Sequence, residues 1–147
     1  MDKVNNIKDV VISPIKIISH PKGDIYHGIK NTDSSFSSFG EAYFSMINYN
    51  EIKAWKKHFK MTLNLIVPLG EVRFVLIDQR INSSTKGNFL DINISSKNYK
   101  RLTIPPNIWM GFKGISKTTN LILNVANIIH DPNEQVNKDL DSIKYQW

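Results

Sequence analysis

Residues 61–78, with the sequence MTLNLIVPLGEVRFVLID, carry the clearest signal of the fold. Two apolar runs of strand length lie on either side of the turn Pro68-Leu69-Gly70. Side chains of a β-strand alternate between its two faces, so Val72, Phe74, Leu76 and Asp78 would share one face of the second run. The segment therefore predicts two strands joined by a tight turn.

Outward from this pair, short apolar and β-branched runs recur, and clusters of Gly, Pro, Asn, Asp and Ser separate them. We find no convincing helical pattern between them, so residues 51–58 are predicted as strand or loop and residues 31–39 as a Ser-rich loop. The pattern predicts an all-β sandwich or barrel, and 147 residues fit one domain over 1–147. The other predicted strands cover residues 10–12, 15–18, 42–47, 89–94, 99–104 and 120–129.

Composition excludes several classes of function. The chain has no cysteine, which rules out disulfides, thiolate metal sites and a cysteine nucleophile. Gly-rich dinucleotide motifs, a Walker loop and a Gly-x-Ser-x-Gly elbow are missing as well. The net charge of +6 is spread along the chain, so we expect no nucleic-acid partner. No apolar run suits a membrane span and the N-terminus does not look like a signal peptide, so we expect a cytoplasmic protein with no membrane partner.

The four histidines are isolated from one another in the sequence. Metal-binding β-helix proteins present two histidines one residue apart on a strand, so that both face one ion. The matching slot here is Lys56-Lys57-His58, which puts an ammonium at the first position. A protonated lysine repels a divalent cation, so we expect no metal at this slot.

Two aromatic segments stand out near the end of the chain. Residues 104–113, IPPNIWMGFK, place Trp109 and Phe112 after a double proline. This segment could be a tight corner with core aromatics, or a pocket rim where an aromatic ring stacks on a base or sugar. Residues 143–147, IKYQW, give an aromatic terminus that we expect to dock on the rest of the molecule.

Beyond these local signals, residues 40–78 and 99–134 resemble the dTDP-4-dehydrorhamnose 3,5-epimerase family of sugar-nucleotide enzymes, and in particular a short subgroup of it. Lys22-Gly23-Asp24 stands where the family has an early charged-glycine element. The matching segments are 40–45 (GEAYFS), 52–55 (IKAW), 58–64 (HFKMTLN), 68–72 (PLGEV), 103–106 (TIPP), 109–114 (WMGFKG) and 130–134 (HDPNE).

The resemblance implies a cupin-like double-stranded β-helix, that is, a jelly-roll barrel, assembled as a homodimer. It also implies a nucleotide-diphosphate 4-keto-6-deoxy sugar as substrate, with no metal or organic cofactor, in surface polysaccharide or deoxysugar biosynthesis. In the family a histidine removes the proton next to the ketone and a tyrosine on the other face returns one. The ketone acidifies the neighbouring C–H bonds, and a nearby cation stabilises the enolate.

The sequence departs from the family at these two positions. Aligning residues 53–56 with the family's Arg-Gly-Leu-His motif places Lys56 at the catalytic histidine, and Leu123 or a neighbour falls at the tyrosine. The subgroup pattern Gly-Trp-His-x-His agrees with this chain at Trp55 and His58. One reading is that Lys56 replaces the histidine as the base, since burial or neighbouring cations can lower the pKa of a lysine. Alternatively, Lys56 binds a phosphate, and the protein is a non-catalytic nucleotide-sugar-binding cupin.

The resemblance nominates seven site residues. Lys56 or His58 would be the catalytic base, with strand alternation placing both on one face and Lys57 on the other. Lys53 would contact the diphosphate in place of the family's arginine. The pocket would be lined by Tyr43, Asn64, Trp109 and Lys113, although core packing would explain Tyr43 and Trp109 equally well.

Overall fold

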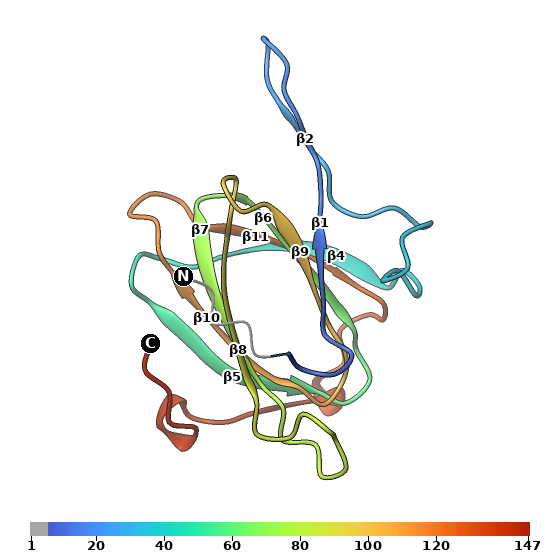
Figure 1. Ribbon diagram of the computed structural model, residues 1–147, viewed down its shortest axis with the longest axis vertical. Helices are drawn as coiled ribbons and strands as arrows, with labels where there is room; N and C mark the ends of the chain where they lie inside the picture. Colours follow the sequence, from blue (N-terminus) through green and yellow to red (C-terminus); the bar gives the residue numbers. More distant parts are fainter. Residues whose placement is uncertain (1–5) are drawn as a thin grey trace.

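The computed structural model describes residues 6–147, and two five-stranded antiparallel sheets form most of it (Figure 1). One sheet, here the β6 sheet, has the strand order β1-β9-β6-β11-β4; the other, the β5 sheet, has the order β12-β5-β10-β7-β8. The strands are β1 (Val11–Pro14), β2 (Ile17–Ile18), β3 (Ile25–Tyr26), β4 (Glu41–Met46), β5 (Ile52–His58), β6 (Leu63–Leu69), β7 (Glu71–Ile77), β8 (Phe89–Ser95), β9 (Lys100–Ile104), β10 (Trp109–Gly114), β11 (Leu121–Ala126) and β12 (Gln135–Asn137).

The prediction of an all-β sandwich or barrel is confirmed. Among residues 6–147 the helical segments are two short 3-10 turns, η1 (Pro132–Glu134) and η2 (Leu140–Ser142). In the described part of the chain, neither helical segment has the length or apolarity needed to cross a membrane. Residues 51–58, predicted as strand or loop, form β5, whereas β3, β10 and β12 were not predicted as strands.

The strands β6 and β7 show why the sequence folds in this way. The inward faces of the two sheets meet in one buried apolar cluster, to which β6 contributes Leu63 and Leu65 and β7 contributes Phe74 and Leu76. The turn between these strands requires Gly70, whose φ is +79° and whose added Cβ would lie 2.2 Å from the Thr119 carbonyl oxygen. Alternating apolar residues and one glycine therefore set the strand pair that the sequence predicted.

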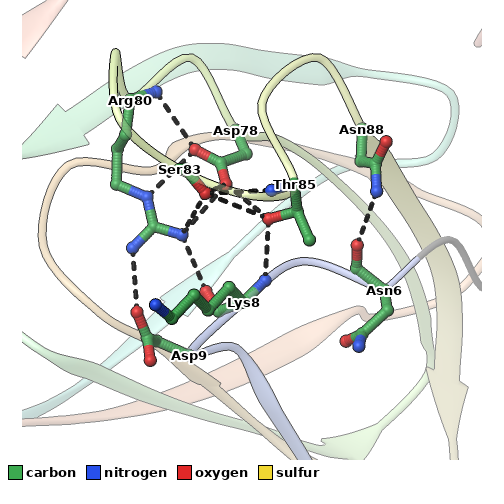
Figure 2. A network of polar contacts seen from close by, with 8 residues as sticks. All are labelled: Asn6, Lys8, Asp9, Asp78, Arg80, Ser83, Thr85 and Asn88. Carbon is green, nitrogen blue, oxygen red and sulfur yellow. Dashed lines mark hydrogen bonds and ion pairs between the residues drawn. The ribbon is translucent and has the colours of Figure 1, made fainter.

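A buried carboxylate fastens the chain near residue 8 to the loop that follows β7 (Figure 2). Asp78 is fully buried and accepts hydrogen bonds from the guanidinium of Arg80 and the hydroxyls of Ser83 and Thr85. Arg80 also donates to the Lys8 carbonyl, at 2.8 Å. Burial raises the pKa of Asp78, but these donors outweigh burial and hold that pKa far below its usual value.

Two peripheral segments complete the molecule. The hairpin of β2 and β3 projects from the body at one end (Figure 1). The C-terminal segment, residues 135–147, begins as β12 at the edge of β5 and then covers the outer face of the β5 sheet. Tyr145 and Trp147 pack there against Phe89 and Trp55, which confirms that the aromatic terminus docks on the molecule.

Candidate active site

A cavity of about 400 Å³ opens between the two sheets. Its apolar lining is formed by Leu63, Leu65, Phe74, Met110, Phe112 and Ile122, which project from strands of both sheets. This volume lies within the usual range for pockets that hold small molecules. The fold therefore leaves interior space for one ligand.

Lysines supply the charge of the cavity. Lys53, Lys56 and Lys138 line it, and among the described lining residues there is no Asp or Glu. The ammonium of Lys53 donates a hydrogen bond to the Met46 carbonyl oxygen at 3.0 Å, which joins β5 to the edge strand β4. A cavity lined by several cations suits a ligand that carries phosphate groups.

His58 and Glu134 form a buried, hydrogen-bonded pair beside this cavity. His58 lines the cavity from β5, and its Nδ1 lies 2.5 Å from Oε1 of Glu134. The other carboxylate oxygen of Glu134 accepts from the backbone N–H groups of Lys60 and Met61, both at 3.2 Å. With Nδ1–H directed at the carboxylate, Nε2 is the ring nitrogen left to take a proton.

The charge of Glu134 follows from its hydrogen bonds. Burial raises the pKa of this carboxyl, but the bonds from His58, Lys60 and Met61 outweigh burial and bring that pKa below its usual value. Glu134 is therefore a carboxylate at neutral pH, and it can both orient the imidazole and stabilise its protonated form. Such a pairing is a common way to build a general base.

A local turn places Glu134 opposite a residue 76 positions earlier. The Asp131 carboxylate accepts from the Asn133 backbone N–H at 2.9 Å, and Pro132 starts η1. The Glu134 carbonyl then accepts from the Phe59 N–H at 2.8 Å, and β12 pairs with the end of β5. We did not predict Glu134 as a site residue, although it ends one of the segments that resemble the family.

Tyr43 lies on the other sheet. It lines the cavity from β4, and its hydroxyl oxygen accepts a hydrogen bond from Nδ2 of Asn124 at 2.8 Å. Asn124 lies on β11 directly opposite Tyr43 in the strand register. Asn124 and Ile122 line the cavity, whereas Leu123, predicted at or near the family's tyrosine position, alternates with them and approaches Gly28.

Four of the seven predicted site residues come together in the structure. Tyr43, Lys53, Lys56 and His58 all line the one cavity. The alternation predicted along β5 is confirmed, because Lys56 and His58 line the cavity whereas the ammonium of Lys57 lies over the rings of Trp109 and Phe59.

Asn64, Trp109 and Lys113 are not among the residues that line this cavity. Asn64 alternates with two inward leucines, and its side chain bonds instead to the Thr103 hydroxyl at 2.6 Å. Trp109 packs with Trp55 under the C-terminal segment. In the segment of residues 104–113, Met110 and Phe112 therefore line the cavity, whereas Trp109 does not.

Comparisons with known proteins bear on the family of the chain and on its fold. The family model described as dTDP-4-dehydrorhamnose 3,5-epimerase matches residues 54–147. The probable low-salt glycan biosynthesis epimerase of Haloferax volcanii is 25% identical over 128 residues, which cover 86% of this chain and 82% of that protein. The spore coat polysaccharide biosynthesis protein SpsL of Bacillus subtilis is 24% identical over 145 residues, which cover 96% of each chain.

Solved structures show the same architecture. The dTDP sugar isomerase from Desulfovibrio desulfuricans superposes with a TM-score of 0.90 at 33% identity, over 92% of this chain and 87% of that chain. The dTDP-4-dehydrorhamnose 3,5-epimerase from Elizabethkingia anophelis superposes with a TM-score of 0.81 at 16% identity, over 100% of this chain and 86% of that chain, a likeness of fold alone. The predicted cupin-like jelly roll is confirmed, and the chain belongs to the dTDP-4-dehydrorhamnose 3,5-epimerase family.

Proposed function

We propose that this protein epimerises a nucleotide-diphosphate-linked 4-keto-6-deoxy sugar in the biosynthesis of a surface polysaccharide or deoxysugar. The observation that carries the proposal is the buried pair of His58 and Glu134 beside a lysine-lined cavity, in a chain of this family. The named relatives act in glycan and spore coat polysaccharide biosynthesis, which supports the same broad role here.

In this proposal His58 is the catalytic base. Nε2 removes the proton from a carbon next to the ketone, and Glu134 stabilises the imidazolium that forms. The pair lies two residues beyond the position that aligns with the family's histidine, where this chain has Lys56. The exposed ammonium of Lys56, on the same face of β5, would stabilise the enolate oxygen, and Lys53 would contact the diphosphate.

Tyr43 returns the proton from the opposite side. His58 belongs to the β5 sheet and Tyr43 to the β6 sheet, so a sugar held between the sheets has one group on each face. Removal of a proton from one face and delivery to the other inverts the carbon. In this role Tyr43 replaces the family's tyrosine, which aligns with β11.

The proposed homodimer and its independence of cofactors follow from the family resemblance. We propose a cytoplasmic homodimer that needs no metal or organic cofactor and binds neither nucleic acid nor membrane. Among residues 6–147, no group of three or more His, Cys, Asp or Glu side chains is placed to hold a metal ion. Stoichiometric iron, nickel or zinc in the purified protein would contradict the part of the proposal that concerns metal.

A second candidate function is nucleotide-sugar binding without catalysis. The observation that favours it is Lys56 at the position of the family's catalytic histidine. The same cavity and lysines would then hold the ligand, and His58 with Glu134 would only stabilise the end of β5. The two functions differ in whether the protein exchanges a carbon-bound proton of the ligand.

Deuterium incorporation separates the two functions. The protein is incubated with a dTDP-linked 4-keto-6-deoxyhexose in deuterium oxide, and label at carbons 3 and 5 is followed by NMR. We expect incorporation by the wild type and a loss of about 100-fold or more in His58→Asn, since a positioned base contributes at least this much. Lys56→Met should weaken incorporation less if Lys56 is not the base.

His130→Asn is the matched control, because His130 is exposed and outside the cavity lining. It should incorporate label at the wild-type rate. Measurable binding of the sugar nucleotide with no incorporation by the wild type would support the binding function instead. Full incorporation by His58→Asn, together with its loss in Lys56→Met, would show that Lys56 is the base.

A further inference from the structure

Asn124 is a polar residue on the buried face of β11, where an apolar residue would stabilise the fold more. The buried residues of β11 alternate with partly exposed ones, and Ile122 and Ala126 share the buried face with Asn124. Asn124 is itself only 3% exposed. Apolar side chains normally fill such positions, because a buried amide needs hydrogen-bond partners for both its nitrogen and its oxygen.

Only one end of this amide is satisfied. Nδ2 donates to the Tyr43 hydroxyl oxygen at 2.8 Å, whereas Oδ1 is buried and has no hydrogen-bond partner among the described residues. An unpaired buried carbonyl destabilises the folded state, and a leucine of similar volume would fill the site without it. The polar residue is therefore kept at the expense of stability, which points to a role in function.

The direction of the bond matters for Tyr43. Because the phenol oxygen accepts from Asn124, the hydrogen of the phenol is not used in this contact and can be directed at a ligand. The same N–H still donates when the phenol has lost its proton, and a hydrogen bond to an ionised oxygen is stronger than one to a neutral oxygen. The contact thus leaves the hydrogen of the neutral phenol free for a ligand, and it stabilises the tyrosinate that remains after the proton has left.

We propose that Asn124 is a positioning residue that fixes the Tyr43 hydroxyl for proton delivery and stabilises the tyrosinate that remains. This inference rests on the proposed function, in which Tyr43 protonates the enolate. In the step, the O–H bond of Tyr43 breaks and a C–H bond forms at the substrate carbon. Tyr43 then regains a proton from water, and protonated His58 releases one to water, so the cycle is balanced.

The test separates exchange from inversion. Protein and a dTDP-linked 4-keto-6-deoxyhexose are incubated in deuterium oxide, and NMR measures both label incorporation and the ratio of epimers. In Asn124→Leu we expect exchange through His58 to stay within about twofold, while inversion falls about tenfold or more for loss of a hydrogen bond to a charged oxygen. Tyr43→Phe should show the same split with a larger loss of inversion.

Two further measurements exclude a merely structural role. Asn124→Leu should unfold at the same temperature as the wild type or higher, since it removes the unpaired carbonyl. Asn124→Asp keeps the shape but makes the side chain an acceptor, so the phenol hydrogen turns toward it and inversion is lost. Asn82→Leu, at an exposed position in the loop after β7, is the control and should change neither rate.

The outcomes distinguish this inference from the proposed function. Wild-type inversion together with full inversion by Asn124→Leu would overturn the role of Asn124 and leave the function standing. A lower unfolding temperature of Asn124→Leu, with exchange and inversion reduced equally, would show a structural role and overturn it as well. A wild type that neither exchanges nor inverts the sugar would overturn both proposals.

Discussion

His58 and Glu134 form the most consequential contact between single residues in this protein. A carboxylate that is only 4% exposed is unfavourable unless it is paired, and here one imidazole and two backbone N–H groups pair it. Those bonds also fix which imidazole nitrogen carries a hydrogen. The same contact therefore decides both local stability and the chemistry that His58 can perform.

Replacement of Glu134 should affect stability in a pH-dependent way. The pKa of Glu134 is below its ordinary value of 4.5 in the folded protein, so its stabilising contribution is present above about that pH and is lost as the pH falls through the folded value. Glu134→Gln should lower the free energy of unfolding at pH 7 by about 1–3 kcal/mol.

Urea unfolding at several pH values checks this prediction. The difference between wild type and Glu134→Gln should shrink as the pH falls below about 4.5, the ordinary pKa of the carboxyl, and through its lower pKa in the folded protein. Glu41→Gln serves as a comparison at a less buried glutamate on β4. A difference that stays constant between neutral and acidic pH would mean that the charge of Glu134 does not stabilise the fold.

At the scale of elements, β10 pairs with β5, the strand that carries the proposed base. Gly111 lies opposite Ala54 in the strand register, and a Cβ at Gly111 would lie 2.5 Å from the Ala54 Cβ and 3.0 Å from the Trp147 ring. The glycine thus lets β5 and the C-terminal segment pack closely. Because β5 also carries Lys53, Lys56 and His58, crowding at this point would move the site residues.

Gly111→Ala should therefore reduce both stability and activity. We expect the free energy of unfolding to fall by about 1–3 kcal/mol, as overpacking usually does. Chemical denaturation measures this loss, and deuterium exchange on the sugar nucleotide measures the effect on the site. Gly28→Ala is the control, because its added Cβ would meet Ile66 at an ordinary 3.7 Å. Equal stabilities of the two variants would contradict the close packing described here.

The elements differ in how far the sequence could predict them. Alternation marks β7 clearly because its inward residues Val72, Phe74 and Leu76 are all apolar. Strands β10 and β12 lack that signal: β10 contains two glycines, and β12 has only three residues. Their pairing with β5 depends on contacts distant in sequence, which no local pattern encodes.

At the scale of the whole molecule, the outer face of the β6 sheet has exposed apolar side chains. Phe44 and Met46 on β4 are 66% and 60% exposed, and Leu69 on β6 is 53% exposed. Met46 pairs with Leu121, which in turn pairs with Leu69, so these side chains form one row across three strands. An apolar row of this kind is typical of a surface that a second protein chain covers.

The proposed homodimer can be tested on this row. We expect the wild type to have the mass of a dimer in light scattering coupled to size-exclusion chromatography, and Phe44→Lys with Met46→Lys to shift it to the monomer. Ile81→Lys is the control, because Ile81 is exposed in the loop after β7 and lies outside the row. A wild type that is monomeric at all concentrations would rule out the dimer.

The candidate site could be predicted only in part, for a reason that concerns the whole fold. Family resemblance nominated Lys53, Lys56 and His58, and alternation was enough to place Lys56 and His58 on one face of β5. The partners Glu134 and Asn124 lie 76 and 81 residues from His58 and Tyr43, and sequence alone does not show such contacts. The resemblance also nominated Asn64, Trp109 and Lys113, which do not line the cavity, because a matching segment does not show which of its side chains point inward.

The order of β5 and β12 along the chain has a consequence for synthesis on the ribosome. The lysines and the histidine of β5 are translated first. Glu134 and β12, the strand that pairs with the outer edge of β5, follow about 75 residues later. A nascent polypeptide that stops before η1 contains the imidazole of His58 but lacks the Glu134 carboxylate that orients it. The proposed proton transfer by His58 would thus become possible only once η1 has been translated, after most of the two sheets could have formed.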